Sequence, residues 1–107
     1  MQSDEKKVND RKIYNLLGLM TKSRKLVSGS FMAERAVKDG SARLVIVSED
    51  ASDNTKKLFR NKCEFYQVPY YIFGNSENIG QAMGKEARVT LAVTDNGFAG
   101  SLKKLLD

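Results

Sequence analysis

The sequence predicts an α/β protein, a three-layer α/β/α sandwich around a mixed, mostly buried sheet of four strands. The first observation behind this prediction is that short apolar runs alternate with helical patterns along nearly the whole chain. The second is that these runs are rich in β-branched residues, as in strands that are covered on both faces. The third is the length of 107 residues, which suits one domain with a hydrophobic core.

The first half of the chain is expected to contain two helices and two strands. Apolar residues recur every three or four positions up to residue 20, which indicates a helix. A second helix follows Gly29, with Ala33, Ala36 and Val37 on its inner face and Gly40 at its end. The expected elements are a helix at residues 10–20, an extended segment at 26–28, a helix at 30–39 and a strand at 44–48.

The second half continues the alternation. Ser52 and Ser76 stand where helix N-caps are expected, and Gly84 stands where a short fourth helix ends. Pro69 begins a strand, a position at which its missing N–H group is tolerated. The expected elements are a helix at residues 53–63, a strand at 70–73, a helix at 77–83, a strand at 90–94 and a helix at 96–106.

Composition narrows the function classes. Histidine is absent, so the commonest general base and metal ligand are missing. Cys63 is the only cysteine, which excludes a disulfide within the chain and indicates a reducing compartment. No apolar run approaches the roughly 18 residues that span a bilayer, and the first residues are polar. We therefore expect a cytoplasmic, monomeric protein with no cofactor, one domain over residues 1–107 and a frayed segment at 1–9.

The positive charge is concentrated near the start of the chain. The net charge is +5, and residues 1–25 hold seven basic and three acidic side chains, which gives +4. A clustered basic surface attracts polyanions, so the charge favours a nucleic-acid partner. The alternative is that these lysines serve only solubility.

No catalytic constellation is found. Glu49, Asp50 and Asp53 follow the second strand and could bind a divalent cation, but a solvated loop with helix-capping acids is the favoured interpretation. Cys63 without histidine is expected to be a small buried hydrophobe. Gly80 lies in a weak glycine pattern inside a short helix, which is not a phosphate-binding loop. We expect neither an enzyme nor a metal site.

The helix that follows Gly29 is the strongest candidate for a binding surface. If its alanines face the sheet, Phe31, Met32 and Arg35 point elsewhere, and Phe31 and Arg35 share one ridge. A helix start offers unpaired N–H groups to an anion, and an exposed apolar side chain can stack on an unpaired base. The alternative is that Phe31 and Met32 complete the core or staple the helix start.

Five segments of the chain match a known family in order. They are the turn at Gly29, the ERAVKDG helix end, the LVIVSEDAS strand and loop, the VPYYIF strand and the IGQAMGKEARVTLAV segment. On these segments, which lie within residues 10–106, the chain resembles the kink-turn-binding ribosomal proteins of the L7Ae and L30e type. Within that superfamily it is most similar to the small bacterial YlxQ-type proteins.

The resemblance implies a sandwich whose RNA surface has two parts, the turn and helix start at Gly29 and a loop at residues 85–88. The family's signature after its glycine is a small residue, then Asn-Glu, then a lysine three residues beyond the Glu. Its Asn and Glu read the sheared G·A pairs of the kinked RNA. In this chain Ser30 and Arg35 occupy the small and basic positions, but Phe31 and Met32 replace Asn and Glu.

The predicted function is a non-enzymatic RNA-binding protein, associated with the ribosome and with ribosomal RNA as its partner. The sequence leaves open whether a standard kink-turn or another folded RNA is bound, because Phe31 and Met32 cannot form the hydrogen bonds of Asn and Glu. The alternative function is a protein-interaction module of the same fold, with Phe31 and Met32 as anchors. The predicted RNA-binding residues are Lys22, Arg24, Lys25, Gly29, Ser30, Phe31, Met32, Arg35, Lys85, Glu86, Ala87 and Arg88.

Overall fold

The computed structural model describes residues 2–107, with side chains from residue 6 onward. Helices and strands alternate along the whole of this range, as the sequence predicts. In chain order the elements are α1 (Gln2–Lys22), β1 (Leu26–Ser28), α2 (Ser30–Lys38), β2 (Leu44–Val47), α3 (Asp53–Tyr66), β3 (Tyr70–Ile72), α4 (Ser76–Ala82), β4 (Thr90–Val93) and α5 (Asn96–Leu106).

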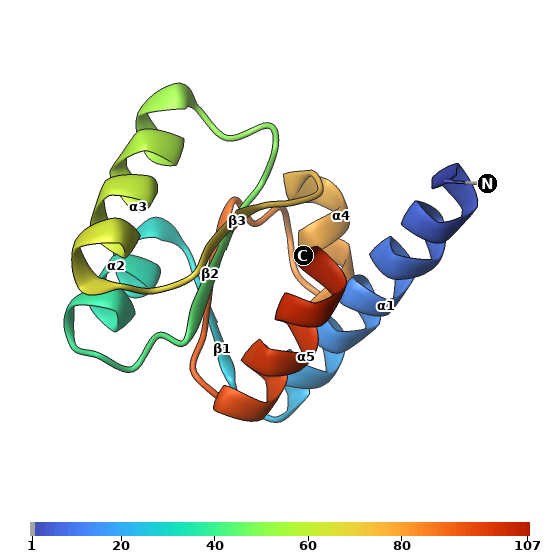
Figure 1. Cartoon of the computed structure of the whole chain (residues 1–107), viewed down its shortest axis with the longest axis horizontal. Coiled ribbons are helices and arrows are strands. Elements are labelled where there is room, and N and C mark those ends of the chain that lie inside the picture. Colours follow the sequence, from blue (N-terminus) through green and yellow to red (C-terminus); the bar gives the residue numbers. More distant parts are fainter. Residues whose placement is uncertain (1) are drawn as a thin grey trace.

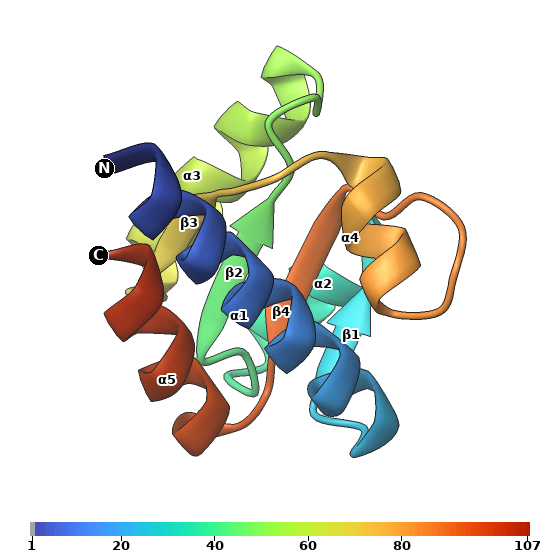
Figure 2. The same ribbon diagram turned by 90° about the vertical axis from the view of Figure 1, so that its right-hand side faces the viewer.

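The four strands form one mixed sheet in the order β1-β4-β2-β3. β4 is antiparallel to both of its neighbours, and β2 and β3 are parallel. Ser28 of β1 lies beside Leu91 of β4, so the last residue of β1 and the first residues of β4 lie at the same end of the sheet. Figures 1 and 2 show α2 and α3 on one face of the sheet and α1, α4 and α5 on the other. The predicted three-layer α/β/α sandwich is confirmed.

The core consists of one apolar layer on each face of the sheet. Alternate residues of β2 point to opposite faces, so Leu44 and Ile46 join one layer while Val45 and Val47 join the other. α1, α4 and α5 close the first layer with side chains that include Leu17. α2 and α3 close the second with Ala33, Ala36, Val37, Phe59 and Cys63. All residues of β2 and β4 are buried, which is why both strands read as continuous apolar runs.

Two predicted helix boundaries differ from the structure. α1 begins at Gln2 rather than near residue 10, because the polar residues before Ile13 continue the helix without contributing to the apolar pattern. The expected fraying of residues 1–9 falls partly outside the described residues and stays a prediction. α3 continues to Tyr66, where Gln67 ends it in a left-handed conformation.

The N-cap residue of α4 also differs from the predicted one. Ser52 caps α3 as predicted, since its side chain accepts a hydrogen bond from the Thr55 N–H group at 3.1 Å. Ser76, however, is the first residue of α4, and the Asn75 side chain accepts the capping bond from the Asn78 N–H group at 2.8 Å. Ser76 is therefore free to bond elsewhere, which matters for the site described below.

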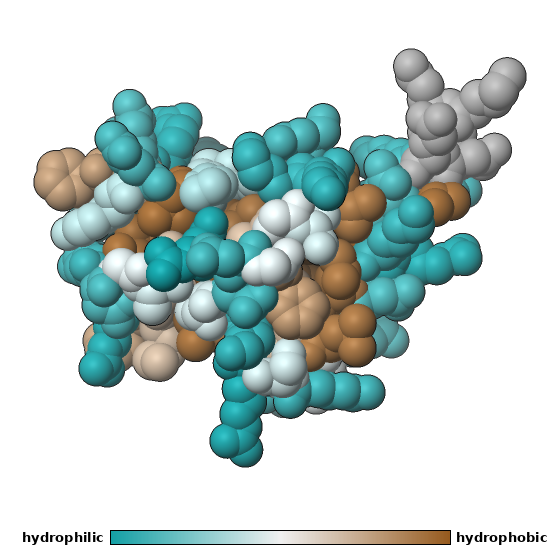
Figure 3. All heavy atoms as spheres, turned by 60° about the horizontal axis from the view of Figure 1, so that its bottom comes forward, coloured by the Kyte–Doolittle hydropathy of each residue, from teal (hydrophilic) through white to brown (hydrophobic). Residues whose placement is uncertain are grey.

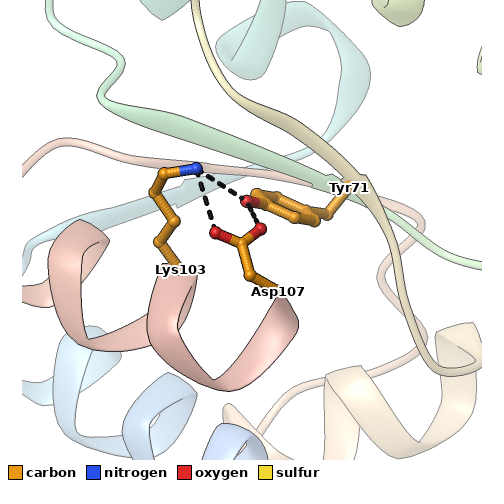
Figure 4. Close-up of polar contacts among 3 residues, drawn as sticks. All are labelled: Tyr71, Lys103 and Asp107. Carbon is orange, nitrogen blue, oxygen red and sulfur yellow. Dashed lines mark hydrogen bonds and ion pairs between the residues drawn. The ribbon is translucent and has the colours of Figure 1, made fainter.

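The last turn of α5 is fixed to β3 by a polar contact (Figure 4). The Tyr71 hydroxyl donates a hydrogen bond to the Asp107 carboxylate, and the Lys103 ammonium lies 3.2 Å from the Tyr71 hydroxyl oxygen and 3.1 Å from Asp107. These contacts hold the end of the chain against the open edge of the sheet.

Figure 3 shows the face that lies at the bottom of Figure 1; it is mainly hydrophilic, with hydrophobic patches in the left and right halves of the view. The most exposed large apolar side chains are Phe65, with 79% of its surface exposed, and Phe31, with 76%. Within residues 2–107, no helix has the length and apolar character needed to cross a bilayer.

Candidate nucleic-acid interface

The turn at Gly29 connects the end of β1 to the start of α2. Gly29 has φ +92°, a conformation that other residues rarely adopt, and its N–H group donates to the Thr90 carbonyl at 2.9 Å. Its own carbonyl accepts the first helical bond, from Ala33. No side chain caps this helix start in the described part of the chain, so the first N–H groups of α2 have no side-chain acceptor.

The loop between α4 and β4 folds back against α4. The Lys85 N–H group donates to the Gly80 carbonyl at 2.8 Å, and the Arg88 N–H group donates to the Ser76 carbonyl at 3.0 Å. This return needs a residue without a side chain at position 80, because a Cβ there would stand 2.0 Å from the Glu86 carbonyl oxygen. Gly80 thus fixes the position of the loop.

The Gly29 turn and the 85–88 loop lie on either side of one hollow. Its volume is about 450 Å³. The Arg88 side chain forms part of its wall and donates a hydrogen bond from Nε to the Ser28 hydroxyl at 3.2 Å. We call it the Gly29 hollow; it is lined by Ser28, Gly29, Ser30, Ala87, Arg88, Val89 and Thr90. The structure therefore brings together the two parts of the surface that the sequence places almost 60 residues apart.

The exposed ridge of α2 continues from this hollow. Phe31 is 76% exposed and Met32 is 43% exposed, whereas the inward-facing Ala33 is fully buried. Phe31 and Arg35 also line a second depression of about 380 Å³ along the helix. Phe31 and Met32 are not part of the core, so the alternative that they complete it does not apply.

Asp50 and Ser76 stabilise the base of the interface. The Asp50 carboxylate accepts hydrogen bonds from the Ser76 hydroxyl at 2.7 Å and from its N–H group at 3.0 Å. Since the Ser76 carbonyl accepts from Arg88, these bonds connect the loop after β2 to the 85–88 loop. The bond from the Ser76 hydroxyl is the main cause that lowers the pKa of Asp50 to about 2.

We expect Ser76→Ala to raise the pKa of Asp50 toward its ordinary value of 3.8. A carboxyl whose pKa is lowered by folding stabilises the folded state above its ordinary pKa, and this contribution is lost as the pH falls through about 2. The variant should therefore show a weaker dependence of stability on pH between these two values. NMR titration of the Asp50 carboxyl carbon measures the shift, with Ser101→Ala on α5 as the control; an unchanged pKa in Ser76→Ala would contradict this assignment.

The predicted binding residues fall into three groups. Gly29, Ser30, Phe31, Met32 and Arg35 lie at or beside the Gly29 hollow, together with the loop that contains Lys85, Glu86, Ala87 and Arg88. Arg24 and Lys25 lie at the opposite end of β1, where the Thr94 N–H group donates to the Lys25 carbonyl. Lys22 lines a separate hollow between α1 and α4, next to Gly84.

Four residues that shape the interface were not among the predicted ones. Ser28 bonds to Arg88, and Ser76 bonds to Asp50 and Arg88; only the folded chain brings these partners within reach, and no sequence signal identifies them. Asp50 was predicted to be a solvated, helix-capping acid, and it is exposed and accepts from the N–H group of Ser76 at the start of α4, but the sequence did not indicate this distant partner. Gly80 offered a signal, because glycine inside a helix is unfavourable unless something approaches closely.

The remaining candidates have structural explanations. No group of three acidic or cysteine side chains among the described residues is arranged to hold a metal ion. Cys63 is buried, as predicted, and its burial raises the pKa of the thiol to about 11.

Comparisons with known proteins identify the family. The family model of the Ribosomal protein L7Ae/L30e/S12e/Gadd45 family matches residues 11–103. The RNA-binding protein YlxQ of Bacillus subtilis (strain 168) is 46% identical over 94 residues, which cover 88% of this chain and 94% of the relative. The protein of the same name from Enterococcus faecium is 35% identical over 99 residues, covering 92% and 95%. The large ribosomal subunit protein eL30 of Branchiostoma belcheri is 30% identical over 107 residues, covering 94% and 90%.

Solved structures of other proteins share the fold of this chain. A Bacillus halodurans protein described as having unknown function superposes with a TM-score of 0.88 at 42% identity, covering 90% of this chain and 97% of that one. The Giardia lamblia 15.5kD RNA binding protein superposes with a TM-score of 0.75 over 91% and 89% of the two chains, and its 21% identity supports the fold alone. The expectation that the protein is not an enzyme agrees with the family and with the YlxQ and eL30 relatives, which are RNA-binding or ribosomal proteins by name. The chain belongs to the Ribosomal protein L7Ae/L30e/S12e/Gadd45 family.

Proposed function

We propose that this protein is a non-enzymatic, ribosome-associated RNA-binding protein that holds a folded RNA, a kink-turn or a similar element, against the Gly29 hollow and the start of α2. The observation that carries the proposal is the hollow itself, in which two distant segments meet beside an exposed Phe31 and Met32. In this proposal the partner is ribosomal RNA in the cytoplasm. One copy of the chain suffices, because both parts of the surface come from the same domain.

Each part of this surface suits a different part of an RNA. The uncapped N–H groups at the start of α2 and the cationic Arg35 suit phosphates. The exposed side chains of Phe31 and Met32 suit the face of an unpaired base, on which stacking contributes about 1–3 kcal/mol. Arg88 is half-buried and bonded to Ser28, so it presents a fixed positive charge in the wall of the hollow.

The dependence of RNA binding on salt tests the proposal. A cationic side chain on a phosphate of single-stranded or distorted RNA contributes about −0.7 to the slope of log K against log salt. The predicted cations are six, of which three, Arg35, Lys85 and Arg88, lie at or beside the Gly29 hollow, so the slope should lie between about −2 and −4. The measurement is a titration of ribosomal RNA fragments at several salt concentrations; no binding at low salt, or a flat dependence, would defeat the proposal.

Arg35→Glu gives the matched variant for this titration. We expect it to weaken binding to every RNA that wild type binds and to reduce the salt slope by about 1. Lys104→Glu is the control, because it makes the same charge reversal at an exposed position on α5.

A protein-interaction module remains the second candidate, and the exposure of Phe31 favours it as well. In that case Phe31→Ala would abolish the retention of a protein partner and leave RNA retention unchanged.

A further inference from the structure

A groove runs along the contact between α1 and α4, which Figure 2 shows side by side. Two hollows, of about 430 and 310 Å³, share Tyr14, Gln81 and Ala82 in their walls, so they form one continuous depression. We call it the α1/α4 groove. The helices are closely packed at its floor, because Gly18 faces the Ala82 carbonyl with no side chain between them. Each hollow has the size of a small-ligand pocket, about 300–1,000 Å³.

The walls of the groove carry side chains that recognise bases. Asn15 and Gln81 are exposed and line the larger hollow, and Asn78 is exposed and lines the smaller one. Side-chain amides both donate and accept hydrogen bonds, which matches the edges of unpaired bases. Lys22 lines the larger hollow as well and places a positive charge there for a phosphate. Leu19, which is 55% exposed, lines the same hollow and offers an apolar surface to the face of a base, so the amides, the cation and this side chain together suit a nucleotide.

The groove is continuous with the proposed RNA surface. Gly84 lines the α1/α4 groove, and the chain then passes directly into the loop that forms one wall of the Gly29 hollow. The loop thus separates two depressions, one toward α2 and one toward α1. Lys85 is exposed on it, between the two. An RNA strand that leaves the Gly29 hollow across Lys85 therefore reaches the groove.

We propose that the α1/α4 groove is a second RNA subsite, which binds a single-stranded nucleotide that flanks the folded element in the Gly29 hollow. The base lies between Asn15 and Gln81, and its phosphate lies on Lys22. This subsite rests on the proposed function, because its occupant is the continuation of the same RNA.

The test compares two probes, a blunt kink-turn hairpin of ribosomal RNA sequence and the same hairpin with a short single-stranded tail at each strand end. Wild type should bind the tailed hairpin about tenfold more tightly, which corresponds to one stacked and hydrogen-bonded base. The double variant Asn15→Asp/Gln81→Glu keeps the side-chain shapes but places two negative charges in the groove. It should bind the blunt hairpin as wild type does and lose the gain from the tail.

The control double variant is Asn54→Asp/Asn61→Asp, which makes the same charge change at exposed amides of α3 on the opposite face of the sheet. It should retain the gain from the tail. Binding is measured at about 0.15 M salt, where exposed charges more than about 8 Å apart are largely screened. If wild type gains nothing from the tail, or if the groove variant keeps the gain, the subsite is overturned while the proposed function stands. If wild type binds neither hairpin nor any ribosomal RNA fragment, both are overturned.

Discussion

Gly80→Ala is expected to displace the 85–88 loop and to weaken RNA binding at least about tenfold, the equivalent of one lost base or phosphate contact. The added Cβ would stand 2.0 Å from the Glu86 carbonyl oxygen and 2.5 Å from its carbonyl carbon. Both are backbone atoms, so no side chain can rotate to relieve the contact. The loop must move away from α4, which breaks the bond from Lys85 to Gly80 and removes Arg88 from its position beside Ser28.

The same substitution is expected to lower the free energy of unfolding by about 1–3 kcal/mol, the usual range for an overpacked site. Urea denaturation gives this value, and RNA titration under conditions where the variant is fully folded gives the loss of affinity. Gly100→Ala is the control, because a Cβ at this position on α5 meets no atom within 4 Å. It should stabilise the protein by about 0.4–1 kcal/mol and leave RNA binding unchanged. A Gly80→Ala protein with the stability and affinity of wild type would show that the loop is not fixed at this point.

The sequence was sufficient for the fold because its local signals agree with one another. The continuous apolar runs that became β2 and β4 lie at the centre of the sheet, where both faces are covered. Ala33, Ala36 and Val37 are buried where helical spacing put them, and this left Phe31 and Met32 exposed. The predicted start of α1 was wrong, because helix propensity without an apolar pattern does not indicate the residue at which a helix begins.

The interface was less predictable because it depends on contacts between distant segments. Position 76 carries a residue suited to capping, but Asn75 takes that role and Ser76 bonds to Asp50, 26 residues away. Arg24 and Lys25 are near Gly29 in sequence, yet the extended β1 carries the chain from one end of the sheet to the other between them. Closeness in the sequence therefore led to the expectation of a tighter cluster of basic residues than the folded chain forms.

Phe31→Asn/Met32→Glu is expected to increase the affinity for a standard kink-turn by about 1–3 kcal/mol, or about 5–150-fold. The two substitutions recreate the Asn-Glu pair of the signature found in the kink-turn-binding proteins that this chain resembles. Because Phe31 and Met32 are exposed, replacing them opens no cavity. The first turn of α2 contains no acidic residue, so Glu at position 32 also interacts favourably with the helix dipole. The fold should therefore be as stable as in wild type, and any change in affinity reports on recognition.

The measurement is a titration of a kink-turn hairpin and of a hairpin whose sheared G·A pairs are replaced by Watson–Crick pairs. Phe65→Asn/Tyr66→Glu is the control, since it removes two exposed aromatic side chains and adds one negative charge at the end of α3. A gain confined to the Phe31→Asn/Met32→Glu protein and the intact kink-turn would mean that the backbone of α2 already stands where the G·A pairs bind. The native Phe31 and Met32 would then exchange hydrogen bonding to those pairs for contact with the face of a base. An equal affinity of wild type and variant for both hairpins would place the RNA elsewhere on the protein, because a positioned Asn and Glu cannot be neutral toward the edges that they read.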